Sequence, residues 1–151
     1  MSDERHMGLG WMIGYLRGNA DSVEAFTQAV GKTIASLEIK DENDGELHMR
    51  FTDDTGIVFY DDARSCCESR YMRTDDDLSY HVGAKLLDAE LSEAPDEDHE
   101  YGTHEIMFLV ITTDKGKFTL ASHNEHNGYY AGISILVRDI NKKWGRWGAE
   151  A

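Results

Sequence analysis

The sequence predicts an α+β fold that is mainly antiparallel β, a meander-type sheet of about six strands with one or two short helices beside it. Two observations predict the sheet. Short runs alternate apolar with polar residues or are rich in β-branched and aromatic side chains, and turn sequences such as DENDG and DKG separate them. One segment near the N-terminus instead repeats its apolar residues at helical spacing. At 151 residues, the chain is the size of one domain.

The first half of the chain predicts one helix and three strands. The helix spans Asp21–Val30, because Asp21 is a good N-cap with a glutamate three positions later and Gly31 ends the apolar repeat. Turn residues then separate three alternating runs, which predict a three-stranded meander. These runs are Thr33–Ile39, Glu46–Thr52 and Ile57–Tyr60.

The second half is less regular until its last third. Residues 63–78 predict irregular backbone, followed by a helical turn and a strand around Leu86–Leu91. Residues 94–103 contain the single proline and predict an exposed loop. Three apolar runs then predict strands, the first two joined as a hairpin. They are Glu105–Thr112, Lys117–Ser122 and Gly132–Val137.

We therefore divide the chain into an N-terminal arm with a short helix (1–30), a β-rich domain (31–140) and a basic tryptophan-containing tail (141–151). Aromatic residues flanked by glycine outside a core often dock on partners, so both ends are candidates for a homo-oligomer interface. Packing on the protein's own sheet is the alternative for the same residues. They are Trp11, Tyr15, Trp144 and Trp147.

The formal net charge of −14 is the strongest compositional signal. A negative field repels phosphate backbones and anionic lipid headgroups, so direct nucleic-acid or membrane binding is disfavoured. The same field is compatible with binding to a basic groove of another protein, or with binding of a small anion in a locally basic pocket. The apolar run near the N-terminus is short and broken by glycines, so we expect no membrane segment and a cytoplasmic protein.

Cys66 and Cys67 are adjacent, and neighbouring cysteines form a disulfide only through a strained ring, which argues against a secreted disulfide scaffold. Nearby arginines favour a thiolate, so a reactive thiol is one interpretation and a buried, packed thiol is the other. The same arginines are candidates to grip a phosphate, with ion pairs to the acids at 75–77 as the alternative. These candidate ligand-binding residues are Arg64, Arg70 and Arg73.

The segment HNEHNGYY (123–130) gathers histidine, asparagine and tyrosine in a predicted connection between strands. His123 and His126 could ligate a metal, although no complete ligand set accompanies them, and a plain Asn-Gly turn is the simplest interpretation. Amides and aromatic faces also suit ligand binding. The candidate ligand contacts are Asn124, Asn127, Gly128, Tyr129 and Tyr130. No cofactor is implied by any motif.

Acidic residues concentrate in two blocks, 41–62 and 88–105. A charge run is usually a solvated face, but carboxylates at regular intervals can also imitate DNA phosphates and occupy a nucleic-acid-binding groove. The candidate partner-binding residues lie in the second block. They are Asp88, Glu90, Glu93, Asp96, Glu97, Asp98 and Glu100.

Four elements together resemble a family of small uncharacterised domains encoded mostly by bacteriophages and prophages. They are GKTI at 31–34, SCCES at 65–69, AKLLDAE at 84–90 and HNEHNGYY. The resemblance covers roughly residues 30–140. It implies a phage setting and hence the cytoplasm of a host cell, and it assigns no activity.

Three functions follow as hypotheses. The first is a non-enzymatic, acidic inhibitor that acts on a host protein of defence or nucleic-acid binding, by analogy with other small accessory phage proteins. The second is a sponge that sequesters a nucleotide-derived immune signal. The third is a small metal- or thiol-dependent enzyme.

Overall fold

A computed structural model of the chain describes residues 12, 15–16, 18–40, 45–62, 69–93, 97–99, 102–126 and 133–141. Within them, nine antiparallel strands form two sheets, which confirms the predicted fold class. The strands are more numerous than the six expected, and they are divided between two layers. The four-stranded sheet has the order β1-β2-β3-β9. It contains β1 (Ile34–Lys40), β2 (Glu46–Phe51), β3 (Gly56–Asp61) and β9 (Ile135–Asp139).

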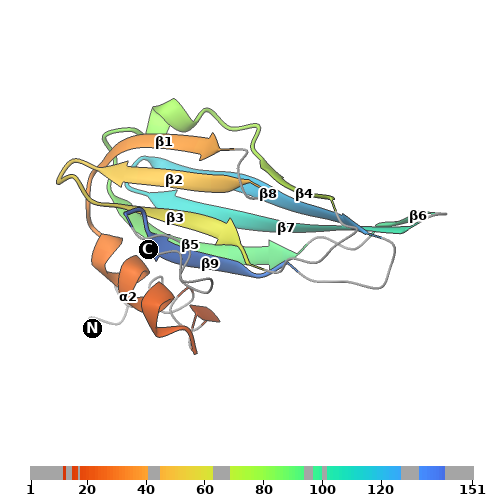
Figure 1. The fold of residues 1–151 in the computed structure, drawn as a ribbon. Helices are drawn as coiled ribbons and strands as arrows, with labels where there is room; N and C mark the ends of the chain where they lie inside the picture. The colour runs from red at the N-terminus through yellow and green to blue at the C-terminus, as the bar shows by residue number, and fades with distance from the viewer. Residues whose placement is uncertain are drawn as a thin grey trace, which may run out of the picture.

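The second sheet has the order β4-β8-β7-β5, and the short strand β6 also pairs with β7 (Figure 1). The long hairpin of β7 and β8 forms its centre, and β6 lies at the end of β7 that points away from the helix. The strands are β4 (Ser69–Arg73), β5 (Leu86–Glu93), β6 (Glu97–His99), β7 (Gly102–Thr113) and β8 (Gly116–His126).

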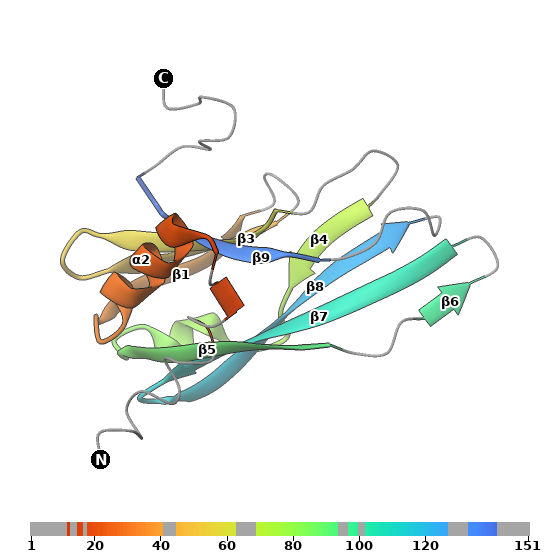
Figure 2. The ribbon, with the colours of Figure 1, turned by 90° about the horizontal axis from the view of Figure 1, so that it is seen from below.

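The two sheets face each other across one hydrophobic core, as the view in Figure 2 shows. Strand alternation sends one set of side chains from each sheet inward. From the first sheet these include Leu47, Met49 and Phe59, and from the second they include Leu109 and Phe118. Residues 31–34 hydrogen-bond to residues 83–86, for example through Gly31 N–H to the Leu86 carbonyl at 2.7 Å, which joins the sheets at one corner.

Helix α2 (Ala20–Ala29) packs beside β9 and β3. Its N-cap is Asn19 rather than the predicted Asp21, because the Asn19 side chain accepts a hydrogen bond from Ser22 N–H at 3.0 Å. The Ser22 hydroxyl donates to the Val137 carbonyl at 2.7 Å, and Phe26 meets Phe59 edge-on. The helix is thus fixed to the same core as the sheets.

A buried ion pair also connects the sheets. The Arg70 guanidinium on β4 donates to the Asp61 carboxylate at the end of β3 at 2.6 Å, and both side chains are almost completely buried. The other Asp61 oxygen accepts a hydrogen bond from Ser134 N–H at 3.0 Å. A buried pair of this kind requires such hydrogen bonds to compensate its desolvation.

Two regions differ from the sequence-based expectation. The stretch expected to be irregular contains β4, and the expected loop around the proline contains β6, whereas the helical turn expected after residue 78 is confirmed as the 3-10 helix η2 (Leu78–His81). Both strands are short and polar, and they form because β7 and β8 extend far enough to pair with them. Pairing supplied by neighbouring strands overrides their weak intrinsic preference.

No helix among the described residues is long and apolar enough to span a membrane.

Candidate binding face

Strand β7 carries apolar side chains on both of its faces. Leu109 and Ile111 point inward and are buried, whereas the alternate residues lie on the outer face of the five-stranded sheet and are partly exposed. These outer residues are Ile106, Phe108 and Val110. An antiparallel strand with one solvated face normally alternates apolar with polar residues. The outer apolar residues therefore indicate a surface suited to a partner.

Carboxylates border this apolar centre. The register places Glu90 of β5 opposite Val110, and Val110 opposite Thr119 of β8. Asp76 follows in the same row, since its carboxylate accepts a hydrogen bond from Thr119 N–H at 2.7 Å. Asp88 lies in the next row, opposite Thr112. We call this surface the acid-rimmed face, with Ile106, Phe108 and Val110 at its centre and Asp76, Asp88 and Glu90 on its rim.

The surroundings of Asp88 disfavour its ionised carboxylate. Burial, together with the neighbouring Glu90, raises its pKa to about 6, although Ala89 N–H and Lys117 act in the opposite direction. Its Oδ1 atom is buried without a hydrogen-bond partner in the part of the chain that the structure describes. A partly buried carboxylate beside a second acid is stabilised by a cation brought by a partner.

Aromatic residues border the other end of the face. Tyr71 of β4 and His123 of β8 are cross-strand neighbours, and their rings stack with centroids 4.5 Å apart. The His104 and His123 rings share a hydrogen bond of 2.9 Å. The Tyr71 hydroxyl donates to Glu125 at 2.6 Å, and burial together with this contact raises the pKa of Tyr71 to about 12. Tyr71 is therefore a neutral hydrogen-bond donor at physiological pH.

A hollow of about 390 Å³ lies between the acidic and aromatic parts. It forms over Ala121, the small residue in a cross-strand row whose neighbours are Phe108 on β7 and Arg73 on β4. The Arg73 guanidinium lies 5.1 Å from the centroid of the Tyr71 ring. The hollow is lined by Arg73, Thr74, Asp75, Asp76, Phe108, Thr119, Ala121 and His123.

The structure separates the candidate ligand residues that it describes. Arg70 and Arg73 lie on opposite faces of β4, with Arg70 buried against Asp61 and Arg73 exposed, so these two do not form one phosphate-gripping cluster. Asn124 is completely buried and donates to Glu105 at 3.3 Å. The remaining candidates lie outside the described residues. They are Arg64, Asn127, Gly128, Tyr129 and Tyr130.

The metal hypothesis placed His123 and His126 in a connection, but both belong to β8. Among the described residues, no three or more histidine, cysteine, aspartate or glutamate side chains are grouped so that they could hold a metal ion. Cys66 and Cys67 lie outside the described ranges, so the thiol hypothesis stays a prediction.

Of the acidic candidates, Asp88 and Glu90 lie on the acid-rimmed face, and Glu93, Glu97 and Asp98 lie in strands β5 and β6. Asp96 and Glu100 fall outside the described residues. Of the aromatic candidates for oligomer contacts, Tyr15 accepts a hydrogen bond from Ile135 N–H at 3.0 Å and so packs on the protein's own sheet. Trp11, Trp144 and Trp147 are not described.

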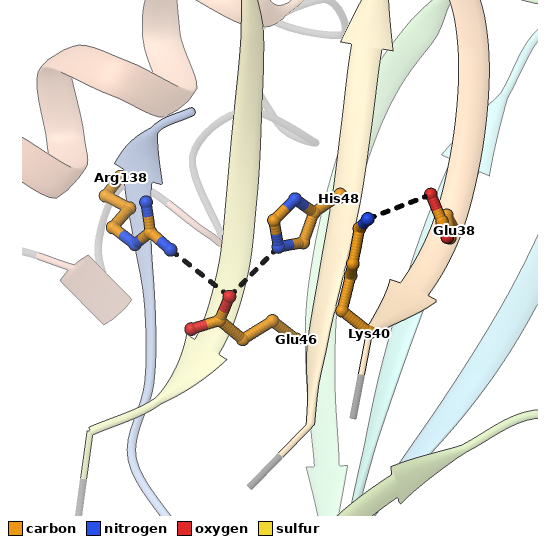
Figure 3. Close-up of polar contacts among 5 residues, drawn as sticks. All are labelled: Glu38, Lys40, Glu46, His48 and Arg138. Carbon is orange, nitrogen blue, oxygen red and sulfur yellow. Dashed lines mark hydrogen bonds and ion pairs between the residues drawn. The ribbon is translucent and has the colours of Figure 1, made fainter. Parts of the chain in front are cut away.

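A second polar cluster occupies the outer face of the other sheet (Figure 3). The nearly inaccessible Glu46 carboxylate accepts hydrogen bonds from Arg138 at 3.2 Å and shares one with His48 at 2.9 Å, and Lys40 pairs with Glu38 nearby. The Arg138 guanidinium of the same sheet thus pairs with the Glu46 carboxylate. This cluster therefore contrasts with the rim of Asp88 and Glu90.

Sequence reasoning missed the apolar centre of the face. The signal is present in EIMFLVIT, where every position from Ile106 to Ile111 is apolar. The run was interpreted only as a strand, whereas apolar residues on both faces also indicate that both faces are covered.

Comparison with known proteins gives one match. No curated protein and no solved structure matches the chain. A family model described as a domain of unknown function, DUF7448, matches residues 27–137, which include the last turn of α2 and all nine strands up to Val137 of β9. This chain therefore belongs to the DUF7448 family.

Proposed function

We propose that this protein is a non-enzymatic binding protein that docks a basic protein surface on its acid-rimmed face. One observation carries the proposal: three partly exposed apolar residues of β7 are bordered by carboxylates on the same face of the sheet. Protein interfaces commonly combine an apolar centre with a polar rim.

Electrostatics supports a basic partner. The net charge of −14 attracts cations over a distance set by the salt concentration, and Asp88 and Glu90 concentrate that field beside the apolar centre. A partner that brings lysine or arginine to Asp88 would also relieve the unfavourable burial of its carboxylate. Acids that oppose folding but assist binding are a recognised compromise between stability and function.

A more specific form of the proposal is that the protein acts in a phage setting. Its partner would then be a host defence or nucleic-acid-binding protein, which it inhibits by imitating nucleic acid. The resemblance to phage-encoded domains and the acidic composition support it. A basic groove that normally accepts nucleic acid has the charge that the rim requires.

The test is affinity capture from a lysate of the host cell at low and at high salt, with the double variant Asp88→Asn/Glu90→Gln. The matched control, Glu24→Gln/Glu38→Gln, removes the same charge from α2 and β1. We expect the wild type and the control to retain one basic protein at low salt, and the face variant to bind it at least about tenfold more weakly. Equal weakening in both variants would show that total charge, and not this face, determines binding.

The apolar centre is tested separately by Val110→Thr, which keeps the shape of the side chain and adds a hydroxyl on the partly exposed face. Weaker binding with unchanged thermal stability is the expected result, because a hydroxyl buried at an interface without a partner is unfavourable. Unchanged affinity would contradict a role for β7 in docking.

A further inference from the structure

The hollow in the acid-rimmed face has the dimensions of an anchor site. It extends along β8 from His123 through Ala121 to Thr119, a distance of about 13 Å for an extended strand. The Phe108 ring lies on one side of Ala121, and Arg73 with the following acids lies on the other. A hollow with an aromatic side, one guanidinium and two carboxylates favours a flat apolar group that carries a polar edge.

An indole ring fits this chemistry. It can pack against Phe108, accept the Arg73 guanidinium on its face, and donate its N–H to a carboxylate of Asp75 or Asp76. Phosphates and other anions fit less well, because two carboxylates oppose the one guanidinium in the hollow. Cations next to the indole would meet the rim formed by Asp76 and Glu90.

One segment of this chain has the required composition. Residues 142–147, KKWGRW, carry two tryptophans and three cations in an otherwise acidic protein. Trp144 and Trp147 are three residues apart, which spans about 10 Å in extended chain and fits within the hollow's length of about 13 Å. Charge and shape therefore both pair this tail with the acid-rimmed face.

The short connection from β9 disfavours binding of Trp144 in the hollow of its own molecule. Trp144 lies three residues after Asn141, a reach of at most about 11 Å. Asn141 lies two residues after the end of β9 in the four-stranded sheet, whereas the side chains that line the hollow lie on the outer face of the five-stranded sheet. Packed sheets are themselves about 10 Å apart, so a tail of this length uses most of its reach in passing from one sheet to the other.

We propose that two copies of the chain exchange tails, so that Trp144 and Trp147 of one copy occupy the hollow over Ala121 of the other. This inference rests on the proposed function, because the tail and the basic partner would bind to the same acid-rimmed face. In a symmetric dimer, each copy donates one tail and receives one. Self-association then covers the apolar centre until the partner displaces it.

Sedimentation velocity of the full chain over a range of concentrations tests the exchange. The receiver variant Ala121→Leu fills the hollow, and the donor variant Trp144→Ala/Trp147→Ala removes the anchors. Thr112→Val, on the same outer face but outside the hollow, is the control. We expect the wild type and the control to dimerise more tightly at low salt, and each variant to dimerise about tenfold more weakly.

Mixing the two variants is the decisive step. The intact tail of the receiver variant can enter the intact hollow of the donor variant, so an equimolar mixture should dimerise more strongly than either variant alone. A general loss of folding would not be rescued in this way. A monomeric wild type, or a mixture no stronger than its components, would overturn the exchange.

The two proposals fail separately. If the wild type stays monomeric while the donor variant still captures the basic partner, tail exchange is wrong and the proposed function stands. If mixing restores the dimer but Asp88→Asn/Glu90→Gln does not weaken partner capture, the exchange stands and the proposed function is wrong.

Discussion

The substitution Asp88→Asn is expected to stabilise the folded protein at neutral pH. Burial raises the pKa of Asp88 to about 6 in the folded state, from 3.8 in the unfolded chain. As the pH rises from 3.8 to about 6, the unfolded chain loses this proton first, so ionisation of Asp88 progressively favours unfolding. The cost is complete above the folded pKa, and asparagine removes it.

The magnitude follows from the same pKa difference. About two pKa units correspond to about 3 kcal/mol as an upper limit. Because the Asp88 side chain is partly exposed, solvent screening reduces the expected gain to about 1 kcal/mol. With a typical slope of about 2 kcal/mol per molar urea, the denaturation midpoint at about pH 7.5 should increase by about 0.5 M.

Urea denaturation of both proteins at about pH 7.5 and at about pH 4.5 gives the test. The gain should be at least halved at the lower pH, where the folded carboxyl is protonated and the unfolded one is only partly ionised. Glu38→Gln, which removes an exposed acid from the other sheet, is the control and should change little. An equal gain at both pH values, or a loss of stability at the higher one, would refute the electrostatic reasoning.

Three further predictions concern the fold. Replacing Arg70 by methionine should destabilise the protein by about 3 to 5 kcal/mol in thermal or urea denaturation, because Asp61 is left buried, and adding Asp61→Asn should recover part of that loss. Burial lowers the pKa of His81 in the folded protein, so the unfolded chain gains the proton first as the pH decreases below about 6.5. The free energy of unfolding should therefore fall in this range, and His81→Phe should flatten its dependence on pH. Gly45→Ala should destabilise by more than about 1 kcal/mol, since φ is +94° and a Cβ atom would lie 2.8 Å from Met72 N; a neutral effect would contradict the close approach.

Local patterns in the sequence predicted much of the framework. Alternation and turn residues located β1, β2, β3 and β9 to within a few residues, because the alternating pattern of a strand is carried by residues that are neighbours in the chain. The helix was placed within one residue at each end, although Asn19 and not Asp21 caps it. Both residues are suitable N-caps, and only the backbone conformation distinguishes them.

Long-range pairing determined what the sequence left open. HNEH at 123–126 is polar and was interpreted as a connection, yet it continues β8 because β4 and β7 hydrogen-bond to it on both sides. Burial of the side chains then alternates along this segment: Asn124 is buried, whereas His123 lies on the outer face of the sheet. Strand propensity does not reveal such a segment, since the stabilising partners are distant in sequence.

The candidate site shows the same division. The sequence by itself determined the acidity, the concentration of acids after Asp88, the basic tryptophan tail and the apolar character of β7. Only the tertiary structure showed that Asp88 and Glu90 share a face with Phe108 and Val110, and that Ala121 opens a hollow beside them. Composition is a property of the chain, whereas a binding face depends on which strands become neighbours, and in this protein that is decided by packing two sheets around one core.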